Sequence, residues 1–127
     1  MTIVLDASAL LALMLDESGS DLVGALHAEA SMCAVNVAEV AERLSRNASG
    51  AVVSESLRTM LPSVIAADTD LAMMAGLMRS ATRSVGLSLG DRFCLALGKR
   101  LSCPVLTADR AWADVADAVG VEVRLIR

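Results

Sequence analysis

Five short apolar runs, each separated from the next by a stretch of helical composition, constrain the fold of this chain more than any other feature. They lie at residues 2–5, 32–35, 63–66, 104–107 and 121–126, and only the last is interrupted by charged residues, Glu122 and Arg124. Runs that are short and continuously apolar are typical of strands buried on both faces. Strands that alternate with helices predict a three-layer α/β/α domain around a central, mostly parallel sheet of about five short strands.

The stretches between the strands predict seven helices. We expect them over residues 8–14, 20–28, 36–44, 52–61, 68–84, 88–101 and 109–118. Ser20 and Asn36 begin two of these stretches and are expected to cap them, because such side chains accept hydrogen bonds from free backbone N–H groups. Apolar residues at helical spacing favour a single long helix over 68–84, ending near Gly86.

Composition limits the domain count and the classes of function. A chain of 127 residues is expected to form one domain, residues 1–127. Hydrophobic residues make up 55% of the sequence, which excludes a disordered chain. Aromatic residues make up only 2%, which argues against a platform for stacking nucleic-acid bases. The formal net charge of −4 disfavours non-specific binding to a nucleic-acid duplex.

The cysteines and the N-terminus indicate a cellular compartment. Cys33, Cys94 and Cys103 form no CxxC pair, so a disulfide framework and a zinc site are both disfavoured, and we expect buried free thiols. The first basic residue is Arg43, and no apolar run approaches the length of a membrane span. These features favour a cytoplasmic protein without membrane contact.

Four carboxylates stand at corresponding places in the predicted topology. Asp6 follows the first strand, Glu39 lies early in the helix after the second, Asp91 opens the helix after Gly86, and Asp109 follows the fourth strand. In parallel sheets, ligands bind beyond the carboxyl ends of the strands, where the strand order reverses. Each acid except Asp6 also has a structural interpretation, as a helix cap or as part of a capping box.

Asp6 is the acid whose position most favours a functional site, and in particular a site for a cation. It follows a strand that should be buried, and an unpaired buried carboxylate is costly. Several acids at one sheet edge repel each other unless they are protonated or bridged by a cation. Carboxylate oxygens suit Mg²⁺ or Mn²⁺, and such ions act on phosphates by activating water and stabilising charge in an in-line displacement.

The segments around these acids resemble a known family. The resemblance lies in Ile3–Leu10 (IVLDASAL), Asn36–Val40 (NVAEV), Leu87–Arg92 (LSLGDR) and Val105–Trp112 (VLTADRAW). In order and spacing these segments are similar to the successive motifs of PIN-domain ribonucleases, and more narrowly to the VapC toxins of bacterial VapBC toxin–antitoxin pairs. The resemblance covers essentially the whole chain.

The resemblance implies an activity and a set of partners. It implies Mg²⁺- or Mn²⁺-dependent endonucleolytic cleavage of RNA, homodimerisation, and inhibition by a cognate VapB antitoxin. Asp6, Glu39, Asp91 and Asp109 would form the catalytic acidic cluster, with Asp6 and Asp91 as direct metal ligands. Ser8 and Thr107 match positions whose hydroxyls would position the acids or a water at the metal.

Arg92 and Arg110 each follow a candidate metal acid. They could contact RNA phosphate, and surface ion pairs are an equal alternative. The only histidine, His27, is expected at the surface or in an interface, and Trp112 is expected to anchor the last helix. Met73, Met74 and Met78 are expected in the core or in a dimer contact.

One departure from the family pattern concerns the metals. Many relatives carry a further acid two residues after the fourth, where this chain has Ala111, and Asp114 lies about one helical turn further on. The departure leaves open a catalytically weak PIN-like binding module. A receiver-type phospho-signalling domain is a weaker alternative, because Ala7 follows Asp6 where a receiver needs a second acid, and the only lysine, Lys99, lies within a predicted helix.

Overall fold

The sheet of the predicted α/β architecture is present and wholly parallel. We describe a computed structural model, in which residues 2–127 are described. The strands are β1 (Ile3–Leu5), β2 (Ala30–Cys33), β3 (Ser63–Ile65), β4 (Val105–Thr107) and β5 (Val123–Leu125). They form one five-stranded sheet in the order β3-β2-β1-β4-β5, and every neighbouring pair is parallel. The three-layer prediction is confirmed.

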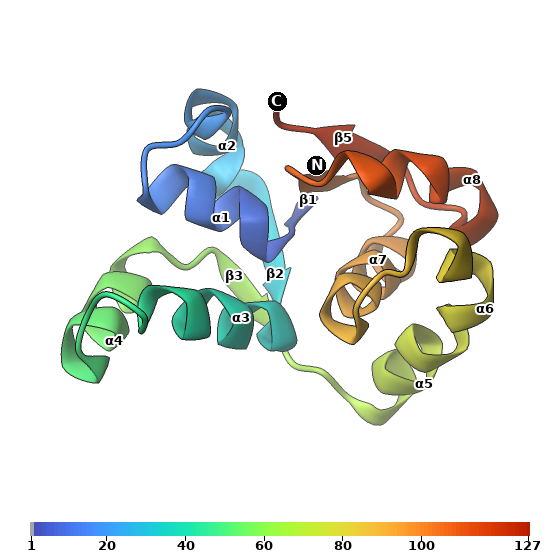
Figure 1. Cartoon of the computed structure of the whole chain (residues 1–127), viewed down its shortest axis with the longest axis horizontal. Coiled ribbons are helices and arrows are strands. Elements are labelled where there is room, and N and C mark those ends of the chain that lie inside the picture. The colour runs from blue at the N-terminus through green and yellow to red at the C-terminus, as the bar shows by residue number, and fades with distance from the viewer. Residues whose placement is uncertain (1) are drawn as a thin grey trace.

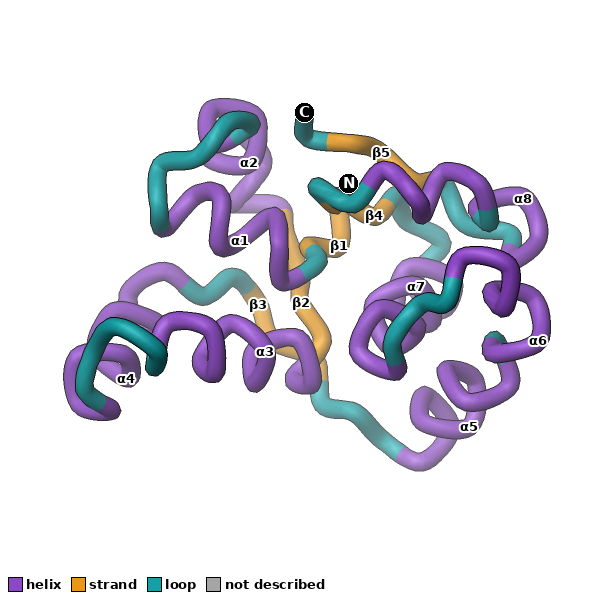
Figure 2. Tube along the Cα trace, in the orientation of Figure 1, coloured by secondary structure: helices purple, strands orange, loops and turns teal. Residues whose placement is uncertain are grey.

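Helices cover both faces of this sheet. They are α1 (Ala7–Met14), α2 (Ser20–Leu26), α3 (Ala34–Leu44), α4 (Gly50–Met60), α5 (Thr69–Leu77), α6 (Arg79–Thr82), α7 (Leu89–Leu101) and α8 (Ala116–Val119), with 3₁₀ turns η1 (His27–Glu29), η2 (Arg83–Val85) and η3 (Arg110–Asp114). Helices α1–α4 lie on one side of the sheet and α5–α8 on the other (Figure 1). In Figure 2 the strands form a narrow band between the two groups of helices.

The alternation of side chains along each strand divides the core into two clusters. Ile3 and Leu5 of β1 point into the cluster under α1–α4, whereas Val4 between them packs with α5, α7 and Trp112 in the other. Side chains two residues apart share a face of a strand, so three apolar residues in succession supply both layers. The expectation of strands buried on both faces therefore holds for the central strands β1, β2 and β4 and is wrong for the edge strands β3 and β5, which are half-buried or exposed.

The strand order reverses between β1 and β4. From β1 the chain adds β2 and β3 on one side, and it then returns to add β4 and β5 on the other. Val4 pairs with Val105 and Leu5 with Leu106, and the Asp6 amide donates to the Leu106 carbonyl at 2.9 Å. The carboxyl ends of β1 and β4 therefore lie side by side at the switch point, where a ligand site is expected.

Two predicted helix starts and one strand are displaced. Strand β2 begins at Ala30, two residues before the predicted run, and α3 begins at Ala34 with Cys33 as its N-cap. The prediction that Asn36 caps α3 is therefore wrong. Helix α2 has Gly19 as its N-cap, in a left-handed conformation with φ 96°, so Ser20 is the first helical residue and does not cap it.

The long helix predicted over 68–84 is broken. Helix α5 ends at Leu77, the short α6 follows Met78, and η2 leads to Gly86 in the left-handed region at φ 61°. The Arg92 guanidinium donates to the carbonyls of Ala75 and Gly76, which satisfies acceptors at the end of α5. Gly76 also lowers helix propensity just before the break.

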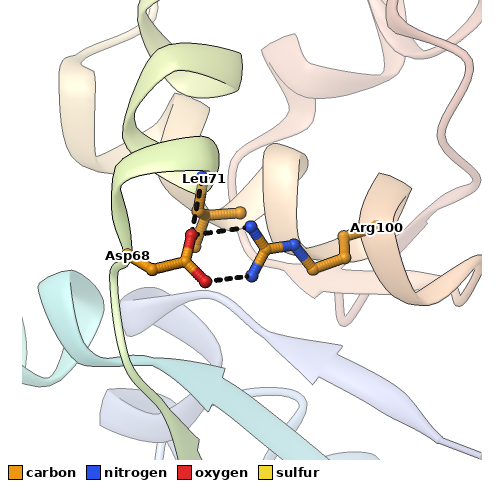
Figure 3. A network of polar contacts seen from close by, with 3 residues as sticks. All are labelled: Asp68, Leu71 and Arg100. Carbon is orange, nitrogen blue, oxygen red and sulfur yellow. Dashed lines mark hydrogen bonds and ion pairs between the residues drawn. The ribbon is translucent and has the colours of Figure 1, made fainter.

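An ion pair fixes the start of α5. Asp68 caps this helix by accepting from the Leu71 amide at 2.8 Å, and the Arg100 guanidinium of α7 donates to both Asp68 carboxylate oxygens at 2.9 and 2.8 Å (Figure 3). The guanidinium and this helix cap hold the pKa of Asp68 at about 2. The pair links α5 to α7, whose first turn carries Asp91.

The remaining sequence predictions concern thiols and membrane contact. Cys33 and Cys94 are buried free thiols, as predicted, and Cys103 is half-buried and also free. Among residues 2–127, no helix has the length and apolar character needed to cross a membrane.

Candidate active site

Asp6 lies directly beyond β1 and is 5% exposed. Its Oδ2 atom accepts hydrogen bonds from the Ser8 hydroxyl at 2.7 Å and from the Thr107 hydroxyl at 3.0 Å. Thr107 is the last residue of β4 and is fully buried. Because both hydroxyls bind the same oxygen, they fix the carboxylate and leave its other oxygen for a further partner.

Ser8 and Thr107 are themselves held by backbone amides. The Ser8 hydroxyl accepts from the Ala108 amide at 2.9 Å, and the Thr107 hydroxyl accepts from the Asp109 amide at 3.1 Å. Each hydroxyl thus has an acceptor contact to backbone and a donor contact to Asp6, which orients its proton toward the carboxylate. Both hydroxyls, which the resemblance implies would position the acids or a water at the metal, thus lie on the Asp6 carboxylate.

Glu39 is half-buried in the second turn of α3. Its Oε1 atom accepts from the Asn36 amide at 2.7 Å, and the same amide donates to the Gly90 carbonyl of α7 at 3.0 Å. A Cβ atom at position 90 would lie 2.5 Å from Glu39 Cδ. Only glycine therefore lets the carboxylate lie against α7.

Asn36 and Gly90 are site residues that sequence reasoning did not find. Both lie within the segments that resemble the family, but Asn36 was interpreted as a cap and Gly90 received no role. The spacing of Asn36 and Glu39 on one helix face was the available signal. Nothing in the sequence shows that α7 packs against that face.

Asp91 lies in the first turn of α7, where one carboxylate oxygen caps the helix and the other is available to a ligand. Its Oδ2 atom accepts from the Ser88 amide at 3.0 Å, and the Ser88 hydroxyl accepts from the Asp91 amide at 3.2 Å. This is the capping box that the sequence offered as the structural alternative. The cap uses Oδ2, so Oδ1 is left for a ligand.

Asp109 is exposed and caps η3, since its Oδ1 atom accepts from the Ala111 amide at 3.0 Å. The structural alternative considered for this acid is therefore also present. Its position directly after β4 nevertheless places it at the same sheet edge as Asp6.

The four acids act on each other electrostatically. Burial is the main cause that raises the pKa of Asp6 to about 6, and the charges of Asp91 and Glu39 also raise it, while the two hydroxyls oppose the shift. Burial and the charge of Asp91 raise the pKa of Glu39. Burial and the charge of Asp109 raise the pKa of Asp91. The structure thus brings all four predicted acids into one negative field.

The donor set suits a hard divalent cation in its chemistry. The side chains offer carboxylate oxygens, and their mutual repulsion is what a cation would relieve. Within residues 2–127, however, no three Asp, Glu, His or Cys side chains already converge tightly enough to coordinate a metal ion together. The protein therefore supplies ligands of the right chemical type, without a preformed cluster of three.

The two candidate arginines differ in their surroundings. Arg92 is half-buried and uses its guanidinium on the α5 carbonyls of Ala75 and Gly76 and, through Nε at 3.4 Å, on the Ser88 carbonyl. Arg110 is exposed beside Asp109. Arg110 is the one whose side chain is more accessible to a ligand in solution.

Other residues singled out from the sequence lie elsewhere. His27 is half-buried, and its ring contacts the Met60 carbonyl at the end of α4. Trp112 is fully buried in the second core cluster, as expected of an anchor for the last helices. Met78 is buried in the same cluster, whereas Met73 is 56% exposed.

The fold and the acidic edge define a class of protein: an α/β/α domain with an acid-lined site at the switch point of its sheet. The chain belongs to the PIN domain family, whose sequence profile matches residues 3–118. PIN domains are generally nucleases. No curated protein sequence matches the chain significantly.

Solved structures share this fold. A toxin–antitoxin complex from Klebsiella pneumoniae is similar with a TM-score of 0.76 at 16% identity over 98% of both chains. VapBC2 from Rickettsia felis, bound to a promoter DNA fragment, gives 0.74 at 12% identity over 98% of both chains. VapC20 from Mycobacterium tuberculosis, a toxin that cleaves the sarcin-ricin loop, gives 0.72 at 15% identity, covering 88% of this chain and 94% of that one.

Proposed function

We propose that this protein is the toxin of a VapBC-type toxin–antitoxin pair and hydrolyses RNA phosphodiester bonds in a reaction that depends on Mg²⁺ or Mn²⁺. The observation that carries the proposal is the buried Asp6, oriented by Ser8 and Thr107 at the switch point and repelled by Asp91 and Glu39. The similarity to toxin–antitoxin structures and to an RNA-cleaving toxin supports it.

Each residue has a distinct task in this proposal. Asp6 and Asp91 would hold the metal ion, since each has one carboxylate oxygen outside the hydrogen bonds to Thr107 and Ser88. Glu39 and Asp109 complete the negative field. A bound Mg²⁺ or Mn²⁺ ion would activate water and stabilise the charge that develops on the phosphate. Ser8 and Thr107 keep the Asp6 carboxylate in one orientation and so reduce the reorganisation that binding requires.

The substrate contact is assigned to the basic residues near the acids. Arg110 is exposed next to Asp109 and can meet an RNA phosphate with charge-assisted hydrogen bonds. Arg92 already satisfies backbone carbonyls, so its contribution to RNA binding is smaller.

Ala111 replaces a further acid, and we therefore expect one ordered ion in the RNA-free protein.

The proposed protein partners are a cognate antitoxin and a second copy of the chain. A segment that places an arginine or lysine among the acids would neutralise the same negative field as a metal ion and would block RNA. A helix-in-groove contact by flanking apolar residues would add affinity. The neighbours that are toxin–antitoxin complexes support this proposal.

Cleavage of RNA by partner-free protein tests the proposed function. We expect activity with Mg²⁺ or Mn²⁺, none with EDTA, and a loss of at least about a hundredfold in Asp6→Ala. Glu55→Ala is the matched control, because this acid is exposed on α4 and contacts none of the four acids. Undiminished cleavage in EDTA, or by Asp6→Ala, would reject the mechanism. Absence of cleavage in the wild type would favour the binding module.

A further inference from the structure

We propose that Asn36 is a positioning residue of the acidic site, whose side-chain amide holds the Glu39 carboxylate against the first turn of α7, beside Asp91. The inference rests on the proposed function, since it concerns how the chain prepares its acids for a cation. It assigns a role to a residue that neither carries charge nor contributes a carboxylate ligand.

The contacts of Asn36 are directed at two elements of the site. The side chain is fully buried. Its Nδ2 atom donates to Glu39 Oε1 at 2.7 Å, within α3, and to the Gly90 carbonyl at 3.0 Å, in α7. An amide NH₂ group has two protons, and both are used by these partners. One side chain thus ties the Glu39 carboxylate to the residue that precedes Asp91.

The chemistry of the partners fixes the orientation of the amide. Both partners are oxygen acceptors, so the NH₂ group must face them, and the reverse orientation would set Oδ1 against two oxygens. Oδ1 itself has no hydrogen-bond partner among residues 2–127. The side chain therefore makes its directed contacts only through the two donors that act on the site.

Asn36 and Gly90 together leave the Glu39 carboxylate little freedom. The amide holds it on one side, and α7 approaches so closely on the other that a Cβ atom at position 90 would lie 2.5 Å from Glu39 Cδ. A carboxylate facing Asp91 would otherwise turn away from the like charge toward solvent. The amide opposes that repulsion and keeps the negative charge of Glu39 close to Asp91.

A role as an ordinary helix cap does not explain these contacts. Cys33 is the N-cap residue of α3, and Asn36 lies three residues into the helix. The Asn36 side chain donates to a carboxylate and to a carbonyl of another helix, whereas a capping side chain accepts from backbone N–H groups of its own helix.

Binding of Mn²⁺ to the partner-free, RNA-free protein, measured by electron paramagnetic resonance, tests this role without relying on activity. We expect Asn36→Ala to weaken Mn²⁺ binding by about ten- to a hundredfold, the range typical when a group in the surroundings of a metal site is lost. Asn36→Ser keeps one donor in a smaller side chain and should give a smaller loss, so a variant that folds remains available.

Two controls separate positioning from general stability. Val40→Ala truncates a fully buried side chain of the same helix and should leave Mn²⁺ binding within about twofold of the wild type, because Val40 packs in the first core cluster and carries no polar group. In a Glu39→Ala background, adding Asn36→Ala should change binding by less than about threefold, since the amide acts through Glu39.

The outcomes distinguish this inference from the proposed function. If the wild type binds Mn²⁺ and both Asn36 variants bind it equally well, the positioning role is wrong and the proposed function stands. The role is also wrong if Asn36→Ala weakens binding just as much in the Glu39→Ala background. A wild-type chain that binds no Mn²⁺ would overturn the proposed function together with this inference.

Discussion

The Thr107 hydroxyl donates a 3.0 Å hydrogen bond to Oδ2 of Asp6 and so joins the end of β4 to the end of β1. The contact crosses the point where the strand order of the sheet reverses. Its donor is oriented in turn by the Asp109 amide, which donates to the same hydroxyl at 3.1 Å. The sheet topology thereby determines the direction in which the Asp6 carboxylate can face.

Thr107→Val tests that contact with almost no change of shape. The hydroxyl lowers the pKa of Asp6, so its removal should raise that pKa further above about 6, which a carbon-13 titration of the metal-free protein would show. We expect RNA cleavage at neutral pH to fall by about ten- to a hundredfold. An unchanged Asp6 titration would mean that the hydroxyl does not act on the carboxylate.

Asp6 should make folding stability depend on pH. Its pKa is raised from 3.8 to about 6 by burial, so the folded state binds the proton more tightly than the unfolded chain. The stabilisation is complete below about pH 4 and is lost as pH rises to about 6, an effect on the order of 1–3 kcal/mol. Urea unfolding in EDTA should therefore show Asp6→Asn gaining stability relative to the wild type across that interval. A difference that does not vary with pH would contradict the burial of the charge.

Substitution by alanine should weaken Mn²⁺ binding at Gly90 and should stabilise the fold at Gly76. Gly90→Ala should displace Glu39, because the new Cβ would lie 2.5 Å from Glu39 Cδ, and should weaken Mn²⁺ binding. Gly76→Ala on α5 meets nothing within 4 Å and should stabilise the fold by about 0.5–1 kcal/mol through helix propensity. Equal Mn²⁺ affinities in the two variants would show that Glu39 has room to move.

Arg100→Gln tests the link between α5 and α7. The guanidinium is the main cause of the low pKa of Asp68, about 2, so the substitution should raise that pKa toward 3.8. The bond from the Leu71 amide remains and should keep the value below 3.8. Arg100→Lys is the comparison, because an ammonium group cannot form the two parallel bonds of a guanidinium. A pKa of Asp68 that is unchanged in Arg100→Gln would contradict the pairing.

Local sequence patterns predicted the order of strands and helices, but not every boundary: the helix predicted over 109–118, for example, is the turn η3 followed by the short α8. The strands at residues 63–66 and 104–107 appear almost as predicted, because a short apolar run with no helical periodicity favours a strand over a helix. The helix over 68–84 breaks where Arg92 of α7 takes the carbonyls of Ala75 and Gly76. That partner lies in another helix, so no local pattern could indicate it.

Part of the candidate site could likewise be predicted from the sequence, and part could not. Asp6, Asp91 and Asp109 follow or open an element of the alternating α/β chain, Glu39 lies early in a helix, and the family resemblance of the segments around them made all four candidates. Asn36 could not be given its role, because that role depends on α7 lying against α3.

The amino-acid sequence by itself determined the layered parallel fold, because periodicity and the order of elements are local properties of the chain. The four acids stood out as candidates by their places in that order, and the hydroxyls of Ser8 and Thr107 only through the family resemblance. Only the tertiary structure decided which oxygens of those acids are already hydrogen-bonded, how far burial raises the pKa of Asp6, and that the Asn36 amide joins α3 to α7. These depend on groups far apart in the sequence, whose distances and desolvation exist only after the helices have packed on the sheet.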